Sequence, residues 1–216
     1  MPETARIKQQ NCEAITKAIS NLEVVNYDTV SSLIPKLLED GELTLDHSVY
    51  TPADSTTISA CGIGRYLVYD HADKTNPFSI WALAFAPRQK TSIHDHKYKG
   101  TVTVLEGPVS EIYYQPTEEH SARRVARFDR HRFHSNSDNL DDTFVHQLKR
   151  RKGLGEGTSV TLHIYNMEAH LISPEGELID RRNLNTIFSK DKRLDEQKNL
   201  PYVGEYQQLG FPKSLS

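Results

Sequence analysis

The stretch TSIHDHKYKGTVTVLEG, residues 91–107, sets two histidines one residue apart immediately before a run of β-branched residues. Valine and threonine recur in this run and a glycine ends it, as is typical of a short strand. Side chains at positions i and i+2 of a strand point to the same face. His94 and His96 can therefore converge on one point inside a barrel, while Asp95 faces the other way. Two buried imidazoles on one face lose solvation unless a partner satisfies their nitrogens, so this pair favours a metal site.

Segments of the same texture recur from Cys61 onward. Each is short, is rich in β-branched and aromatic residues, and is bounded by Gly, Pro, Asn or Asp. Many short strands without intervening helices indicate a closed or sandwich-like antiparallel β fold. The expected strands are residues 65–70, 78–87, 100–107, 109–116, 142–150, 159–166 and 170–176.

The N-terminal part of the chain has a different pattern. Apolar residues recur at helical spacing in residues 3–23 and again in 26–41, where Gly41 ends the pattern. Pro35 lies inside the second pattern and is expected to kink or shorten that helix. The apolar stripes of these helices need a partner, which the barrel supplies. The expected organisation is a single domain with a helical cap at 1–55, a barrel at 56–193 and a polar, irregular tail at 194–216.

The composition is that of an ordinary soluble domain, with 37% hydrophobic and 25% charged residues in a chain of 216. A net charge of −3 argues against nucleic acid as the main partner, and the basic runs at 123–132 and 149–152 are interpreted as solvated loops or faces. Cys12 and Cys61 are too few for a disulfide scaffold and lack the CxxC spacing of a zinc site. No apolar signal segment or membrane span stands out, so we expect a cytoplasmic protein without a membrane partner.

A metal held by His94 and His96 needs a third ligand from elsewhere in the chain. His146 in FVHQL and His163 in TLHIY both lie in expected interior strands. A lone histidine in such a strand is commonly a hydrogen-bonded core residue, so the residues themselves leave the choice open. The histidines expected at the surface, from their polar loop contexts, are His47, His71 and His120.

The pattern SIHDHxxxGxVxVLxG resembles the first cupin motif in the form found in thiol dioxygenases of the cysteine dioxygenase family. General cupins carry a glutamate ligand a few residues after the two histidines, but here KYKG, residues 97–100, occupies that stretch. The resemblance implies a mainly β cupin fold, a jelly-roll barrel (double-stranded β-helix), with Fe(II) held by three histidines and no carboxylate. TFVHQL resembles the later motif of the family, which implies His146 as the third metal ligand beside His94 and His96.

Two further segments extend the resemblance, which covers roughly residues 60–175. SVTLHIY resembles the late barrel strand of the family, which implies that His163 and Tyr165 lie beside the iron as catalytic residues. GRYLVYD resembles the segment that carries the substrate-binding arginine, which implies that Arg65 grips the carboxylate of the substrate.

Three features depart from the family pattern. Gly100 stands where the animal enzymes carry a cysteine that cross-links to the active-site tyrosine, so no such thioether is expected here. Thr161 replaces the serine that usually precedes the histidine–tyrosine pair, although its hydroxyl can still orient His163. The stretch after His146 is longer than usual and lacks the cupin asparagine, which leaves His134 as the alternative third ligand.

The implied reaction is the oxidation of a thiolate by O2 to a sulfinate, because three neutral imidazoles leave the full charge on the iron and so attract an anionic thiolate. An arginine that grips a carboxylate favours L-cysteine or 3-mercaptopropionate over cysteamine, and arginine rather than glutamine in that position favours cysteine. A contact from Arg181 or Arg182 would reopen the choice between these two thiols. The alternatives are a three-histidine cupin that binds zinc and a non-catalytic metal-binding cupin sensor or scaffold. The expected partners are the small thiol and O2, with the chain a monomer or weak homo-oligomer.

Overall fold

The computed structural model of the protein describes residues 2–58, 60–95, 98–118, 121–137, 145–151, 153, 157–172, 182–186 and 207–208. The helices in this part of the chain are α1 (Glu3–Ser20), α2 (Tyr27–Glu39) and the short α3 (Ala169–Ile172). The strands are β1 (Gly64–His71), β2 (Phe78–Phe85), β3 (Ile93–Asp95), β4 (Gly100–Glu106), β5 (Val109–Glu118), β6 (Ser121–Arg130), β7 (His134–Ser137), β8 (Val145–Lys149), β9 (Ser159–Tyr165), β10 (Arg182–Thr186) and β11 (Gln207–Gln208). Within the described residues, no helix has the length and apolar character needed to cross a membrane.

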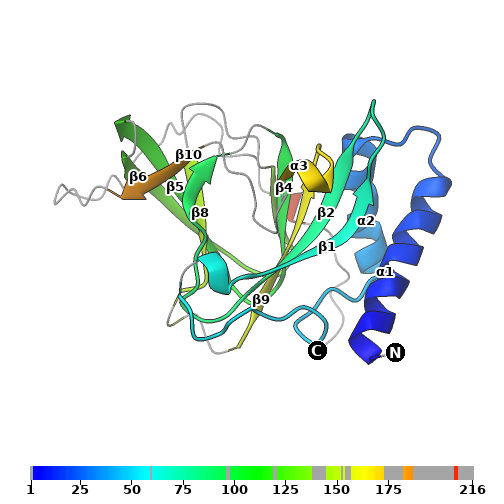
Figure 1. Ribbon diagram of the computed structural model, residues 1–216, viewed down its shortest axis with the longest axis horizontal. Coiled ribbons are helices and arrows are strands. Elements are labelled where there is room, and N and C mark those ends of the chain that lie inside the picture. Colours follow the sequence, from blue (N-terminus) through cyan, green and yellow to red (C-terminus); the bar gives the residue numbers. More distant parts are fainter. Residues whose placement is uncertain are drawn as a thin grey trace.

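The strands form two sheets that enclose the interior of the protein (Figure 1). The first sheet has the order β1-β2-β9-β4-β7-β11, and the second closes through β10-β3-β8-β5-β6. Neighbouring strands are antiparallel except for β10 and β6, which run parallel. Apolar side chains of both sheets meet in one buried cluster, which includes Trp81, Leu83, Phe85, Val102, Val104, Val109 and Leu148. The inner faces of the two sheets therefore share one core.

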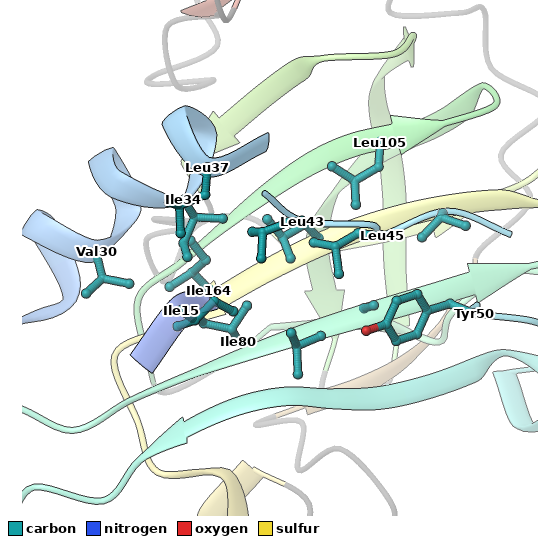
Figure 2. Packing of buried hydrophobic residues seen from close by; sticks show 14 of the residues in the cluster. Ile15, Val30, Ile34, Leu37, Leu43, Leu45, Tyr50, Ile80, Leu105 and Ile164 are labelled. Atoms are coloured by element: carbon teal, nitrogen blue, oxygen red, sulfur yellow. The ribbon is translucent and has the colours of Figure 1, made fainter. Parts of the chain in front are cut away.

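The N-terminal helices cover the outer face of the first sheet (Figure 1). Ile15 of α1 and Ile34 of α2 are fully buried and pack with Ile80 of β2 and Ile164 of β9 (Figure 2). Each buried side chain of this size stabilises the fold by about 1.5–3 kcal/mol relative to an exposed position. The expected fold, a mainly β barrel of jelly-roll type with an N-terminal helical cap, is thus confirmed. Because the helices pack on the outer face of the sheet, its inner face is available for the candidate site.

Helix α2 begins with a capping box and continues through a proline. The side chain of Asn26 accepts a hydrogen bond from the Thr29 N–H at 2.9 Å, and the Thr29 hydroxyl accepts one from the Asn26 N–H at 3.1 Å. The sequence predicts that Pro35 kinks or shortens the helix; α2 continues past the proline to Glu39, so it does not end there, and the kink stays a prediction. Ile34, next to the proline, is fully buried, and its packing offsets the lost backbone hydrogen bond.

The segment that follows β9 also differs from its sequence-based expectation. Residues 170–176 are predicted as a strand, but Ala169–Ile172 form helix α3. The Asp70 carboxylate accepts a hydrogen bond from the Ala169 N–H at 2.9 Å, and Ile172 is fully buried in the shared core. The strand prediction is therefore wrong for residues 170–172, and residues 173–176 lie outside the described residues.

The basic run at 123–132 lies largely in β6. Its exposed arginines are Arg123, Arg124, Arg127 and Arg132, in keeping with a solvated face. Arg130, however, is only 2% exposed, because its pairing with Val109 of β5 places it on the inner face. Arg150 in the second basic run is also buried. The interpretation as solvated residues is therefore wrong for these two arginines.

The C-terminal part of the chain lies mostly outside the described residues. Gln207 and Gln208 pair antiparallel with Ser135 and His134 of β7. The predicted boundaries between cap, barrel and tail stay predictions.

Candidate functional site

Two histidines from the second sheet face each other inside the protein. His94 on β3 and His146 on β8 are direct partners across the two strands. Their ring centroids lie 4.8 Å apart, and the side chains are buried, with 8% and 1% of each residue exposed. The pairing of β3 with β8 thus brings together two imidazoles that are distant in the sequence.

Hydrogen bonds determine which nitrogen of each imidazole carries the proton. His94 Nδ1 lies 3.0 Å from the Ser92 carbonyl oxygen, and His146 Nδ1 lies 3.1 Å from Glu111 Oε1. A carbonyl and a carboxylate only accept hydrogen bonds, so Nδ1 donates in both rings, and in the neutral form of each ring Nε2 bears the lone pair. This arrangement is typical of histidines that bind a metal through Nε2. The two imidazoles are thus oriented as metal ligands would be, but the described residues contain no group of three or more side chains that could hold a metal ion.

The charge state of His94 suits the same role. Burial, and then the neighbouring His146, His163 and Arg65, lower the pKa of His94 to about 3. At neutral pH the ring is uncharged, and the uncharged imidazole is the form that binds metal.

A buried carboxylate stands behind His146, and sequence reasoning missed it. Glu111 on β5 is fully buried, and Arg130 Nε donates to its Oε2 at 2.6 Å. Burial opposes the ionisation of Glu111, but the hydrogen bond from His146 and the charge of Arg130 lower its pKa to about 2. One pattern in the sequence could have indicated that Glu111 is buried. Side chains alternate between the two faces of a strand, so Glu111 lies on the same face of β5 as the apolar Val109.

Strand β9 supplies a second hydrogen-bonded chain on the first sheet. Thr161, His163 and Tyr165 alternate along the strand, so their side chains share the inner face. His163 Nε2 lies 2.8 Å from the Thr161 hydroxyl, and His163 Nδ1 lies 2.9 Å from the Tyr165 hydroxyl. Burial, and then the nearby His146, lower the pKa of His163 to about 3. His163 thus holds two hydroxyls with its two nitrogens and is neutral.

Arg65 lies on the same row of the first sheet as this chain. It is half-buried on β1 and pairs with Leu83 of β2, which in turn pairs with Thr161 of β9. Residues directly opposite each other in antiparallel strands point to one face, so Arg65 faces the interior. Its charge also contributes to the low pKa of His94. The structure therefore brings Arg65, His94, His146 and the Thr161–His163–Tyr165 chain together.

Several predicted site residues lie outside this description. His96 and Arg181 fall outside the described residues, as do the side chains of His134 and Arg182. Only the backbone of Arg182 is placed, opposite Asp95 where β10 pairs with β3. Neither the choice between His146 and His134 nor a second arginine contact is tested.

Of the three histidines expected at the surface, the two that are described have partners outside the cluster. His47 pairs with Glu106 at 2.6 Å and is exposed. His71 stacks on Phe78, with ring centroids 4.7 Å apart. His120 lies outside the described residues.

The ring of Tyr165 contacts two residues near the start of β4, Tyr98 and Gly100. Tyr98 contacts it edge-on, with ring centroids 4.9 Å apart. Gly100 pairs with Tyr165 across β4 and β9, and a Cβ added at Gly100 would come within 2.6 Å of Tyr165 Cδ1 and 2.8 Å of Cε1. Only glycine allows this close approach. The absence of a side chain at residue 100 thus leaves room for the Tyr165 ring, which carries the hydroxyl.

Replacing Gly100 with alanine should displace the Tyr165 ring and lower the free energy of unfolding by about 1–3 kcal/mol, as is typical of overpacking a buried contact. Urea unfolding measures this change. In a Tyr165→Leu background, where the ring is absent, the added methyl group should cost much less. An equal cost in both backgrounds would show that the contact with Tyr165 is not the cause.

Comparisons with known proteins found only partial structural similarity at low sequence identity. No family model and no curated protein sequence matches the chain. The solved structures to which it is similar include a Cupin 2 conserved barrel domain protein from Salinispora arenicola (TM-score 0.37, 13% identity, 50% of this chain and 77% of that chain). A cupin domain from Schizosaccharomyces pombe has a TM-score of 0.36 and 6% identity over 53% of this chain and 72% of that chain. A sugar phosphate isomerase of a cupin superfamily, from Silicibacter pomeroyi, has a TM-score of 0.32 and 13% identity. The match covers 41% of this chain and 50% of the isomerase.

Proposed function

We propose that this chain is an iron-dependent thiol dioxygenase that oxidises a small carboxylate-bearing thiol, with L-cysteine as the favoured substrate, to a sulfinate. Fe(II) would be held by His94, His96 and His146. The observation that carries the proposal is the buried pair His94 and His146, in which hydrogen bonds at both Nδ1 atoms leave both Nε2 atoms as lone-pair donors. The resemblance to the cysteine dioxygenase family supplies the substrate class.

The overall reaction balances without a further reductant. A thiolate and one dioxygen molecule give one sulfinate: two S–O bonds form, the O–O bond breaks, and the four electrons lost by sulfur are accepted by dioxygen. When bound, Fe(II) supplies a site at which thiolate and dioxygen meet in the correct orientation. The protein must therefore bind the thiol, orient it and exclude water.

Arg65 is the residue suited to binding the substrate carboxylate. Its planar guanidinium can make two parallel charge-assisted hydrogen bonds to a carboxylate, which a lysine cannot duplicate. Its position on the row of Thr161 directs it to the interior beside His94. A thiol without a carboxylate would lack this contact.

Tyr165 is the residue suited to donating a hydrogen bond to the bound reactants. Its hydroxyl has one proton, so it can donate inward only if it accepts from His163 Nδ1. His163 Nε2 must then accept from the Thr161 hydroxyl, which lies 2.8 Å away. The Thr161 hydroxyl can make this donation, and it thus supports the tautomer that turns the Tyr165 proton toward the substrate.

Oxygen uptake across a small panel of thiols tests this function. Protein loaded with Fe(II) should consume O2 with L-cysteine or 3-mercaptopropionate and yield the matching sulfinate, identified by mass spectrometry. Cysteamine, which has no carboxylate, should be a poor substrate. The variant Arg65→Met should lose most of the preference for carboxylate thiols while keeping its iron. If fully loaded protein oxidises neither carboxylate thiol, the proposed function is wrong.

A further inference from the structure

A buried ion pair stands directly behind His146 and has no task in the chemistry described so far. Glu111 is fully buried and Arg130 is 2% exposed. The two carboxylate oxygens have different partners: Oε1 accepts from His146 Nδ1 at 3.1 Å, and Oε2 accepts from Arg130 Nε at 2.6 Å and from Arg130 Nη2. Arg130 Nη2 also donates to the Tyr113 hydroxyl at 3.3 Å. The carboxylate is therefore fixed in one orientation.

Stability alone is a poor explanation for this pair. Removing two charges from water costs free energy that their attraction repays only partly, and well-packed apolar residues often serve as well or better. Glu111 and Arg130 lie on the inner face among apolar residues such as Val109, where apolar side chains would fit the pattern. The contact that apolar residues could not replace is the hydrogen bond to His146.

The two imidazoles of the candidate site are held by unlike acceptors. His94 Nδ1 donates to a neutral backbone carbonyl, that of Ser92, whereas His146 Nδ1 donates to a carboxylate. A carboxylate draws the Nδ1 proton more strongly and so makes Nε2 a better electron donor. His146 is thus the stronger of the two donors.

We propose that Glu111 is a positioning residue for metal binding through His146. It fixes the ring with Nε2 toward the site and supplies, from behind the ligand, part of the negative charge that a set of three neutral histidines lacks. Arg130 orients Glu111 and limits that charge. This inference rests on the proposed metal site.

The test compares Co(II) binding by the full-length protein and two Glu→Gln variants. Glu111→Gln keeps an oxygen acceptor for His146 but removes the charge, and it should weaken Co(II) binding roughly 10- to 100-fold. The intensities of the Co(II) d–d absorption bands should change as well. Glu106→Gln is the matched control, because Glu106 also accepts from a histidine, His47, but at the surface. It should leave both affinity and spectrum unchanged.

A second variant protects the test against misfolding. Glu111→Gln leaves Arg130 buried beside a neutral group, which can unfold the protein. The double variant Glu111→Met/Arg130→Met removes both charges and the acceptor at once. It should keep the thermal unfolding midpoint of the metal-free protein near that of the parent and still bind Co(II) more weakly. Nitrogen-15 NMR of the metal-free double variant should show His146 as a mixture of tautomers instead of the Nδ1–H form.

The outcomes separate this inference from the proposed function. Parent affinity and spectrum in every folded variant would overturn the role of Glu111 and leave the metal site intact. Failure of the parent protein itself to bind Co(II) or Fe(II) would overturn the metal site, and with it this inference.

Discussion

Replacing His146 with alanine should abolish stoichiometric metal binding and all thiol oxidation. The change removes one of the two lone-pair donors that face each other across β3 and β8, and it leaves Glu111 without its imidazole partner. The measurement is the ratio of metal to protein after loading with Fe(II) under anaerobic conditions, followed by oxygen uptake. Undiminished iron content would contradict the assignment and point to His134 as the third ligand.

His170→Ala is the control for this variant. His170 Nδ1 lies 3.1 Å from Glu168 Oε2, the same distance that separates His146 Nδ1 from Glu111 Oε1, but its side chain is 66% exposed. Its loss should leave metal content and turnover unchanged. Thermal unfolding of both metal-free variants separates loss of a ligand from loss of the fold.

Replacing Tyr165 with phenylalanine should lower kcat by about 100-fold and leave the iron content unchanged. A positioned proton donor contributes to rate on this scale, and the substitution removes only the hydroxyl that lies 2.9 Å from His163 Nδ1. The ring keeps its contacts with Tyr98 and Gly100, so the barrel core stays packed. Steady-state oxygen uptake with L-cysteine and metal analysis of the same sample measure the two effects.

Two further variants locate the origin of the Tyr165 effect. Thr161→Val removes the hydroxyl that can donate to His163 Nε2 and should produce a smaller fall in kcat. Tyr114→Phe removes a buried tyrosine hydroxyl that bonds Gln147 at 3.1 Å and should leave kcat unchanged. A kcat for Tyr165→Phe equal to that of the unaltered protein would exclude Tyr165 as a proton donor.

Local periodicity accounts for the parts of the fold and site that were predictable. In β9, Thr161, His163 and Tyr165 alternate, and the structure shows them hydrogen-bonded on the inner face as period two requires. The strands at 78–85 and 159–165 were predictable because they are continuous runs of apolar and β-branched residues. The N-terminal helices were predictable from their apolar stripes.

Other elements could not be predicted, because they depend on contacts between residues that are distant in the sequence. Strand β6 escaped prediction because its arginines resemble a solvated run, although Arg130 is buried against Glu111. Helix α3 formed where a strand was expected, because Asp70 accepts a hydrogen bond from the N–H of Ala169. Both outcomes require partners far away in the chain.

The sequence by itself determined a mainly β barrel with a helical cap, and strand patterns in it made His94, His146 and His163 candidates. The family resemblance added Tyr165 and the role of His146 as third ligand. Only the tertiary structure decided which of them meet. The register of β3 on β8 sets His94 opposite His146, and the register of β5 on β8 and β6 brings Glu111 between His146 and Arg130. The physical reason is that a buried charge is tolerated only where a partner contacts it. Strand register determines which residues, distant in the sequence, become such partners.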